Sequence, residues 1–214
     1  FSGVDHFQLF DFTTQDGQVD ENVFAYSNRH GTERALVVVH NRYAETTGRV
    51  HLAVGKTERS GPGGEPRQVR RSLGEALDIR GGTHDFLIFR ETISGLEHIH
   101  RASEVTDRGL SFSLHAYDRR VLLDWREVED TDGTLAAVES FLAGRGTPSI
   151  TEAVRELSQE PVRQAAGELL NAGFLGWLAT DTLSGGTVVP ERIAQFGERM
   201  ARLLKALAEH TGQA

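Results

Sequence analysis

The chain has 214 residues, of which 38% are hydrophobic and 25% charged, enough for a buried core in one or two soluble domains. Its formal net charge of -8 and its pI of about 5.6 argue against nucleic acid and anionic membrane surfaces as partners, because both require a basic face. The absence of cysteine excludes disulfides, thiolate catalysis and cysteine-ligated zinc, and it favours a reducing, cytoplasmic compartment without proving one.

Short β-rich segments dominate the first part of the chain. Residues 7–12 open with partial alternation of apolar and polar side chains, and residues 23–26, 35–39 and 49–54 follow. Each is bounded by Asn, Gly or charged residues, a pattern typical of consecutive antiparallel strands. Residues 35–39 are apolar throughout, which predicts a core strand covered on both faces.

A helix signal interrupts the strand pattern. Ser94 and Glu97 have the spacing of a capping box, in which the serine oxygen and the glutamate each satisfy a free backbone N–H. This spacing predicts a short helix that runs through Ile99 and Ala102 and ends at Gly109, because glycine favours the helix C-terminus.

The strand pattern then resumes. Residues 111–117 alternate between apolar and polar side chains, which predicts a strand with one dry face, and residues 121–125 form a further apolar run after a polar turn. This spacing of strands and turns favours an antiparallel Greek-key β-sandwich over residues 1–133, and hence a mainly β chain. A parallel sheet would require helical crossovers, and no segment here fits one.

The hydrophobic period changes from 2 to 3.6 at about residue 134, so residues 134–214 are predicted to be a helical segment packed on the sandwich. Ser149 and Glu152 form a second capping box that starts a helix, and Pro161 is expected to end or restart it. Pro190 suits the first position of a last, amphipathic helix.

Four stretches carry a resemblance to a known family: residues 23–54, 85–97, 109–117 and 121–128. They resemble the region that follows the catalytic barrel in certain large bacterial enzymes of the alpha-amylase superfamily of glycoside hydrolases. The resemblance covers roughly the first 130 residues well and the helical tail less securely. It implies a C-terminal accessory region whose partner is the upstream catalytic barrel of the same polypeptide, with alpha-glucan as a further ligand.

The resemblance does not bring a catalytic site with it. A catalytic (β/α)₈ barrel takes ~250 residues, more than this whole chain, so the catalytic residues of the family have no matching positions here. We therefore expect a non-catalytic module, and we interpret the first residue, Phe1, as a sign of an excised piece of a longer enzyme. The alternatives are a detached glycan-binding module, a protein-interaction scaffold that uses the amphipathic last helix, and an autonomous enzyme with an unrecognised carboxylate or histidine pair.

Aromatic side chains are the candidate binding residues, because sugars stack on aromatic faces. Tyr43 follows Asn41 and Arg42 at a strand end, where contact with the neighbouring barrel is favoured over direct glycan binding. Trp125 lies in an apolar strand, where a place in the core is favoured. The remaining aromatic candidates are Tyr26, Tyr117 and Trp177.

The nine histidines raise the question of a metal site. Residues two apart on a helix point away from each other, so His98 and His100 would share an ion only on an extended segment. His40 and His51 are a second pair that a hairpin would bring together. No carboxylate cluster accompanies either pair, and no phosphate loop, dinucleotide fingerprint or serine nucleophile motif occurs, so no metal, cofactor or catalytic residue is assigned.

Overall fold

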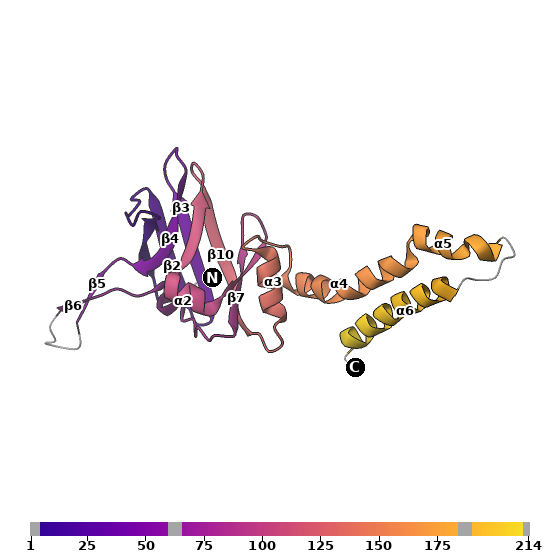
Figure 1. Ribbon diagram of the computed structural model, residues 1–214. Helices are drawn as coiled ribbons and strands as arrows, with labels where there is room; N and C mark the ends of the chain where they lie inside the picture. Colours follow the sequence, from indigo (N-terminus) through magenta and orange to yellow (C-terminus); the bar gives the residue numbers. More distant parts are fainter. Residues whose placement is uncertain (1–4, 60–65, 184–189, 212–214) are drawn as a thin grey trace. The chain divides into compact units, whose positions relative to one another are not determined.

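The computed structural model describes residues 5–59, 66–183 and 190–211, and it divides into two units, 1–150 and 151–214 (Figure 1). Roughly 39% of the chain is helix and 35% is strand, so the chain is mixed rather than mainly β. The helix α3 (Thr134–Leu142) begins where the predicted helical segment begins, but it belongs to the first unit with the strands.

The first unit is built on one curled, eight-stranded antiparallel sheet, a half-barrel, with the strand order β8-β7-β10-β3-β2-β1-β4-β9. Two further strands form a separate hairpin, β5 (Lys56–Arg59) with β6 (Pro66–Val69). The eight strands of the sheet are β1 (Gln8–Thr14), β2 (Val23–His30), β3 (Glu33–His40), β4 (Thr46–Ala53), β7 (Asp85–Glu91), β8 (Glu97–Arg101), β9 (Leu110–Leu114) and β10 (Arg119–Glu129).

The prediction of antiparallel strands followed by helices is confirmed, but the eight strands form one sheet rather than the two sheets of a sandwich. The reason is β10, which pairs with β3 through its first residues and with β7 through the rest. Its register shifts between Leu123 and Arg126, where Asp124 adopts a φ of 54°, so the strand bends and carries the sheet around the core. Apolar and polar residues alternate in the same way along a strand of a curled sheet and a strand of a sandwich, so the sequence does not distinguish the two.

The core lies inside the curl. Two short helices, α1 (Leu73–Leu77) and α2 (Ala102–Arg108), contact each other there, α1 against β2 and β4 and α2 against β7 and β8. They add five buried side chains to the inward residues of the strands. The largest inward side chains of the strands are Phe10, Phe12, Phe89 and Trp125, followed by Leu36, Leu87, Leu110, Leu114 and Leu122.

The helix predicted to begin at the capping box of Ser94 and Glu97 is wrong in its first part, since residues 97–101 are the strand β8 and α2 begins only at Ala102. Pairing with β7 outweighs the capping signal here, and the carboxylate of Glu97 binds arginines on the outer face of the sheet instead. The predicted end at Gly109 is confirmed, because Gly109 is the C-cap of α2 with a φ of 71°.

The outer face of β7 and β8 is covered by α3. Phe86 and Ile88 alternate with the inward residues of β7, yet both are buried, as are Val138 and Leu142 of α3. The guanidinium of Arg101 in β8 lies 5.1 Å from the ring centroid of Phe86 and 3.8 Å from the carboxylate of Glu139 in α3. A second, smaller apolar cluster therefore lies behind this half of the sheet.

The second unit consists of helices. The helix α4 (Ile150–Leu170) begins at the predicted capping box and continues through Pro161, contrary to the expected break, and α6 (Pro190–Thr211) begins at the predicted proline. The guanidinium of Arg199 in α6 lies 4.0 Å from the ring centroid of Phe174 in α5 (Ala172–Leu183). None of the described helices is both long and apolar enough to span a membrane.

Candidate functional site

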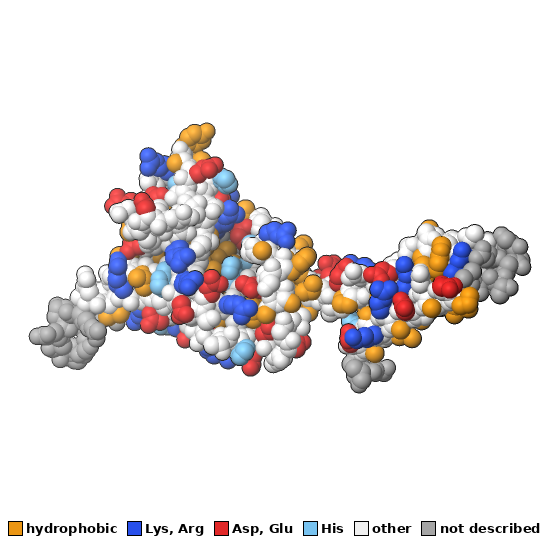
Figure 2. Space-filling view, viewed as in Figure 1, with side chains coloured by type: hydrophobic (Ala, Val, Ile, Leu, Met, Phe, Trp, Pro, Cys, Tyr) orange, Lys and Arg blue, Asp and Glu red, His pale blue; other side chains and the backbone are white. Residues whose placement is uncertain are grey.

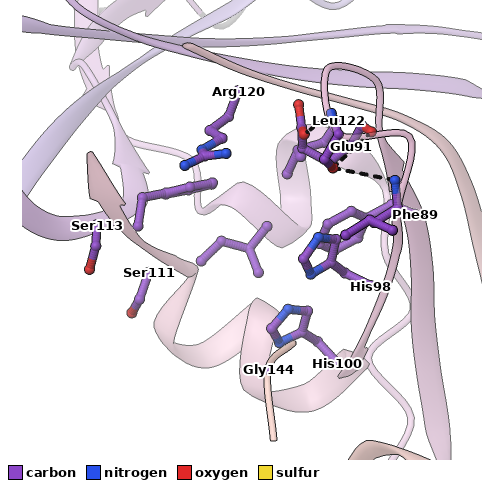
Figure 3. Close-up of a pocket in the computed structure, with 13 residues that line it drawn as sticks. Phe89, Glu91, His98, His100, Ser111, Ser113, Arg120, Leu122 and Gly144 are labelled. Atoms are coloured by element: carbon purple, nitrogen blue, oxygen red, sulfur yellow. Dashed lines mark hydrogen bonds between the residues drawn. The ribbon is translucent and has the colours of Figure 1, made fainter. Parts of the chain in front are cut away.

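A cavity of about 450 Å³, partly open to solvent, lies at the seam where the two edge strands of the sheet, β8 and β9, approach each other. We call it the seam cavity. Figure 3 shows the Arg120 guanidinium and the rings of His98 and His100 turned toward this space, while Ser111 and Ser113 come from the opposite strand. Its other lining residues are Phe89, Glu91, Ser94, Leu96, Leu110, Phe112, Leu122 and Gly144.

One wall of the seam cavity is formed by rings on β7 and β8. The ring of Phe89 stacks on His98 at a centroid distance of 5.7 Å and on His100 at 5.6 Å. The Phe89 ring also contacts the ring of Trp125 in β10, at a centroid distance of 4.5 Å. His98 and His100 are two residues apart on a strand, so both rings lie on the same, inward face. This is the extended arrangement that a shared ligand would need.

Both imidazoles are neutral at neutral pH. Burial lowers the pKa of His98 and the charge of Arg120 lowers it further, against opposing effects of the Gly144 carbonyl and the Glu91 carboxylate. Burial also lowers the pKa of His100, with a further decrease from its neighbour His98. A neutral imidazole has one donor and one acceptor nitrogen, so each ring can exchange hydrogen bonds with a hydroxyl group.

Glu91 is buried beside these rings and is held ionised. Burial alone would raise its pKa, but hydrogen bonds from the Ser94 hydroxyl and from the backbone N–H groups of Ser94, Ile93 and Val121 outweigh that effect, so the pKa is lowered. Its carboxylate accepts from the Ser94 N–H at 2.7 Å and from the Ile93 N–H at 3.0 Å. Glu91 therefore holds the β7–β8 turn rather than acting as an acid.

These histidines predict a pH dependence of stability. The unfolded chain takes up their protons near pH ~6.5, whereas the folded chain takes them up only at lower pH. The two histidines therefore do not lower the free energy of unfolding at pH values above the unfolded pKa of ~6.5. As the pH falls from that value toward the folded pKa values, the free energy of unfolding decreases. We expect NMR titration to place both imidazole midpoints below ~6.5; a midpoint at or above that value for either ring would contradict the assignment.

A second aromatic feature lies at the ends of the loops after β3 and β9. Tyr43 is 84% exposed and Tyr117 is 64% exposed, and their ring centroids are 6.4 Å apart. The two loops are tied together, since the Tyr117 N–H donates to the Arg42 carbonyl at 3.3 Å and a His40 ring nitrogen lies 2.9 Å from the His115 carbonyl. We call Tyr43 and Tyr117 the loop aromatic pair.

The predicted binding residues do not form one site. Asn41, Arg42 and Tyr43 share the loop after β3, with Arg42 lining a shallow hollow beside Asp16 and Asp20. Trp125 is 7% exposed in the core, and its indole N–H donates to the Leu122 carbonyl at 3.0 Å. The ring nearest to that of Tyr43 among these candidates is Tyr117. The sequence gives both tyrosines as candidates, but their proximity follows only from the fold.

Two histidine pairs are candidates for a metal site from the sequence, His98 with His100 and His40 with His51. Within residues 5–59, 66–183 and 190–211, no group of three or more His, Cys, Asp or Glu side chains could hold a metal ion. His98 and His100 do share a strand face, and His40 instead pairs with a backbone carbonyl. The two cavity groups that sequence reasoning missed are Glu91 and Arg120, which stand in ordinary strand contexts that carry no motif.

Models of known protein families give no match to this chain, and curated protein sequences give none either.

Proposed function

We propose that this chain is a non-catalytic C-terminal accessory module of an alpha-glucan-acting glycoside hydrolase, which stabilises the upstream catalytic barrel of the same polypeptide. The observation that carries the proposal is an apolar area on the outer face of β1 and β2 and beside them. A contiguous exposed apolar patch on a folded protein indicates a site of interaction, whereas single exposed apolar side chains do not. The strand order β3-β2-β1-β4 supports the proposal further, because it is the order of a Greek key.

This outer apolar face is continuous across neighbouring strands. Leu9 of β1 is 50% exposed and pairs with Tyr26 of β2, whose ring lies 5.6 Å from that of Phe7. Phe24 of β2 is 55% exposed on the same side. Val54 is also exposed, and its N–H donates to the Leu9 carbonyl at 2.8 Å, which places it beside Leu9. Elsewhere on the sheet unit, Figure 2 shows Lys and Arg mixed with Asp and Glu over the viewed face.

The size of the native polypeptide tests this proposal. An antibody raised against this chain should detect, in the source cells, a band larger than the chain by at least a barrel of ~250 residues. A band at 23.6 kDa would overturn the proposal, since the chain would then act alone.

Contact with polysaccharide is a second function, favoured by the loop aromatic pair. Two exposed rings on one edge of the sheet unit offer apolar faces to successive sugar rings. The two loops are held by the bond from the Tyr117 N–H to the Arg42 carbonyl and by the contact of the His40 ring with the His115 carbonyl, so truncating Tyr43 leaves the loops in place.

We expect Tyr43→Ala to weaken glycogen binding by roughly tenfold, the loss typical of one stacked ring. The measurement is retardation in native gels that contain glycogen, with Tyr26→Ala as the control because Tyr26 lies on the outer apolar face. Equal retardation of the wild type and Tyr43→Ala would exclude the loop aromatic pair as a glucan site.

A scaffold function is favoured by α6. Over the described range Pro190–Thr211 none of its side chains is buried, and Ile193 and Leu204 are 59% and 58% exposed. Hydrogen exchange of the α6 amides, compared between the isolated chain and its parent protein, tests this function. Protection that appears only in the parent would support a partner surface there, and equal exchange would oppose it.

A further inference from the structure

We propose that the edge strand β9 joins two copies of this chain, which pair antiparallel about a two-fold axis through Phe112. β9 is one end of the eight-stranded sheet, and within the described residues only β4 pairs with it. An edge strand presents unpaired backbone N–H and C=O groups, which are a template for a strand of another chain. The inference does not depend on the proposed function, since docking on a barrel uses the outer face of β1 and β2.

The sequence of β9 is symmetric about its centre, and this symmetry selects a second copy as the partner. The strand reads Leu-Ser-Phe-Ser-Leu, which is the same in both directions. A two-fold antiparallel pair of such strands places Phe112 opposite Phe112 of the second copy, and Ser111 opposite Ser113 of the second copy. Aromatic pairs and hydroxyl pairs in directly opposed positions both stabilise a sheet. An interface between identical surfaces requires this kind of self-complementarity.

The two edges of the sheet differ in how they are protected from such pairing. At the opposite edge, β8 begins and ends with charged residues, Glu97 and Arg101. The segment before α4 also covers it, since the Glu97 N–H donates to the Thr147 carbonyl at 2.7 Å and the Thr147 N–H donates back at 2.9 Å. Charge, proline, bulges and coverage are the usual means of blocking an edge. β9 has no charged residue, no proline and no register shift against β4.

Both faces of β9 suit the two-fold register. On the outer face, Ser111 and Ser113 are exposed, and their hydroxyls make only long contacts, 3.5 Å from the Arg49 guanidinium and 3.2 Å from the Thr47 hydroxyl. In the paired sheet, the row that starts at Arg49 ends at Thr47 of the second copy, so the two guanidinium groups do not face each other. On the inner face, Phe112 is half-buried, and the opposed ring would remove more of its surface from water.

The oligomeric state of the full chain is the first test. A pair of five-residue strands buries less than the about 1,200 Å² of a stable interface, so we expect a dissociation constant in roughly the micromolar range. Sedimentation equilibrium should give a mass that rises with concentration from 23.6 kDa toward twice that value. A mass that stays at 23.6 kDa up to ~1 mM would overturn the proposal and leave the edge to an extended segment of another protein.

Paired charges test the register. Ser111→Lys combined with Ser113→Glu places opposite charges in both serine pairs, whereas Ser111→Lys combined with Ser113→Lys places like charges there. We expect the two-lysine variant to dimerise at least about tenfold more weakly than the lysine–glutamate variant, although it lowers the net negative charge of the chain. Both positions are exposed, so both variants should unfold at the wild-type midpoint. Equal dimerisation of the two would contradict pairing through β9 and indicate another surface, such as α6.

The absence of cysteine allows a direct check by cross-linking. A mixture of Ser111→Cys chains and Ser113→Cys chains should form an interchain disulfide on air oxidation, because directly opposed strand residues have the Cα separation that a disulfide needs. Either variant alone should cross-link more slowly, since the same position in the two copies lies on a diagonal. Equal rates in the mixture and in the single variants would exclude this register. The size of the native polypeptide on a denaturing gel does not affect these results, so they are separate from the test of the proposed function.

Discussion

Replacement of Gly109 by alanine is expected to destabilise the sheet unit by about 3 kcal/mol or more, one of the two largest effects of any single change proposed for this chain. Gly109 has φ 71° and ψ -164°, a region open essentially to glycine alone. An added Cβ would lie 2.0 Å from the Val50 carbonyl oxygen and 2.7 Å from the Cα of His51. Both neighbours are backbone atoms of β4, which pairs with β9 immediately after Gly109, so neither can move away without breaking the ladder.

The matched control is Gly95→Ala. Gly95 also has a positive φ, 73°, but no described atom lies within 4 Å of an added Cβ. The Gly95→Ala substitution should therefore lower the free energy of unfolding by only about 1 kcal/mol, the penalty of the left-handed backbone itself. Urea denaturation followed by the fluorescence of the buried Trp125, in a Trp177→Phe background, gives both values. Equal losses in the two variants would show that crowding against β4 contributes nothing.

Gly109 illustrates how far the sequence leads. Its place at the end of a helix follows from local signals, and the structure confirms it. Its contact with β4 joins residues some sixty positions apart, and no local signal encodes such an approach. The same limit applies to β10, since alternation reports that a strand has two faces but not that one strand serves both halves of a curled sheet.

The candidate site follows the same division. The sequence predicts a helix start at the strand that carries His98 and His100. The capping pattern of Ser94 and Glu97 is visible in the local sequence, whereas the pairing of this strand with β7 is not. Tyr43 was identifiable as an exposed ring at a strand end, a judgement that depends only on its neighbours in sequence. The seam cavity brings together four strands, including both edges of the sheet, so its existence depends wholly on the curl.

Replacement of Glu97 by alanine is expected to cost about 2 to 4 kcal/mol, the second large effect. The residue is buried at 8% exposure, and its Oε1 accepts from Arg90 and from Arg126, both at 2.9 Å. Its Oε2 accepts at 2.8 Å from the N–H of Ile150, the first residue of α4. Alanine would leave that buried N–H unpaired and two guanidinium groups facing each other. The expected cost is no higher because the side chains of Arg90 and Arg126 are partly exposed, and water screens their charges.

Two further variants separate the parts of this effect. Glu97→Gln keeps an acceptor but loses the charge, so its cost should fall between that of alanine and the wild type. Glu139→Ala removes the 3.8 Å ion pair with Arg101 on the same face of the sheet, and a partly exposed pair of that length should contribute under ~1 kcal/mol. If thermal denaturation found Glu97→Ala no more destabilising than Glu139→Ala, the Glu97 carboxylate would contribute no more to stability than a partly exposed ion pair does. The start of α4 would then have to be held by the apolar contacts of Ile150, which is 2% exposed, because the backbone pairing of residue 97 with Thr147 is common to all three variants.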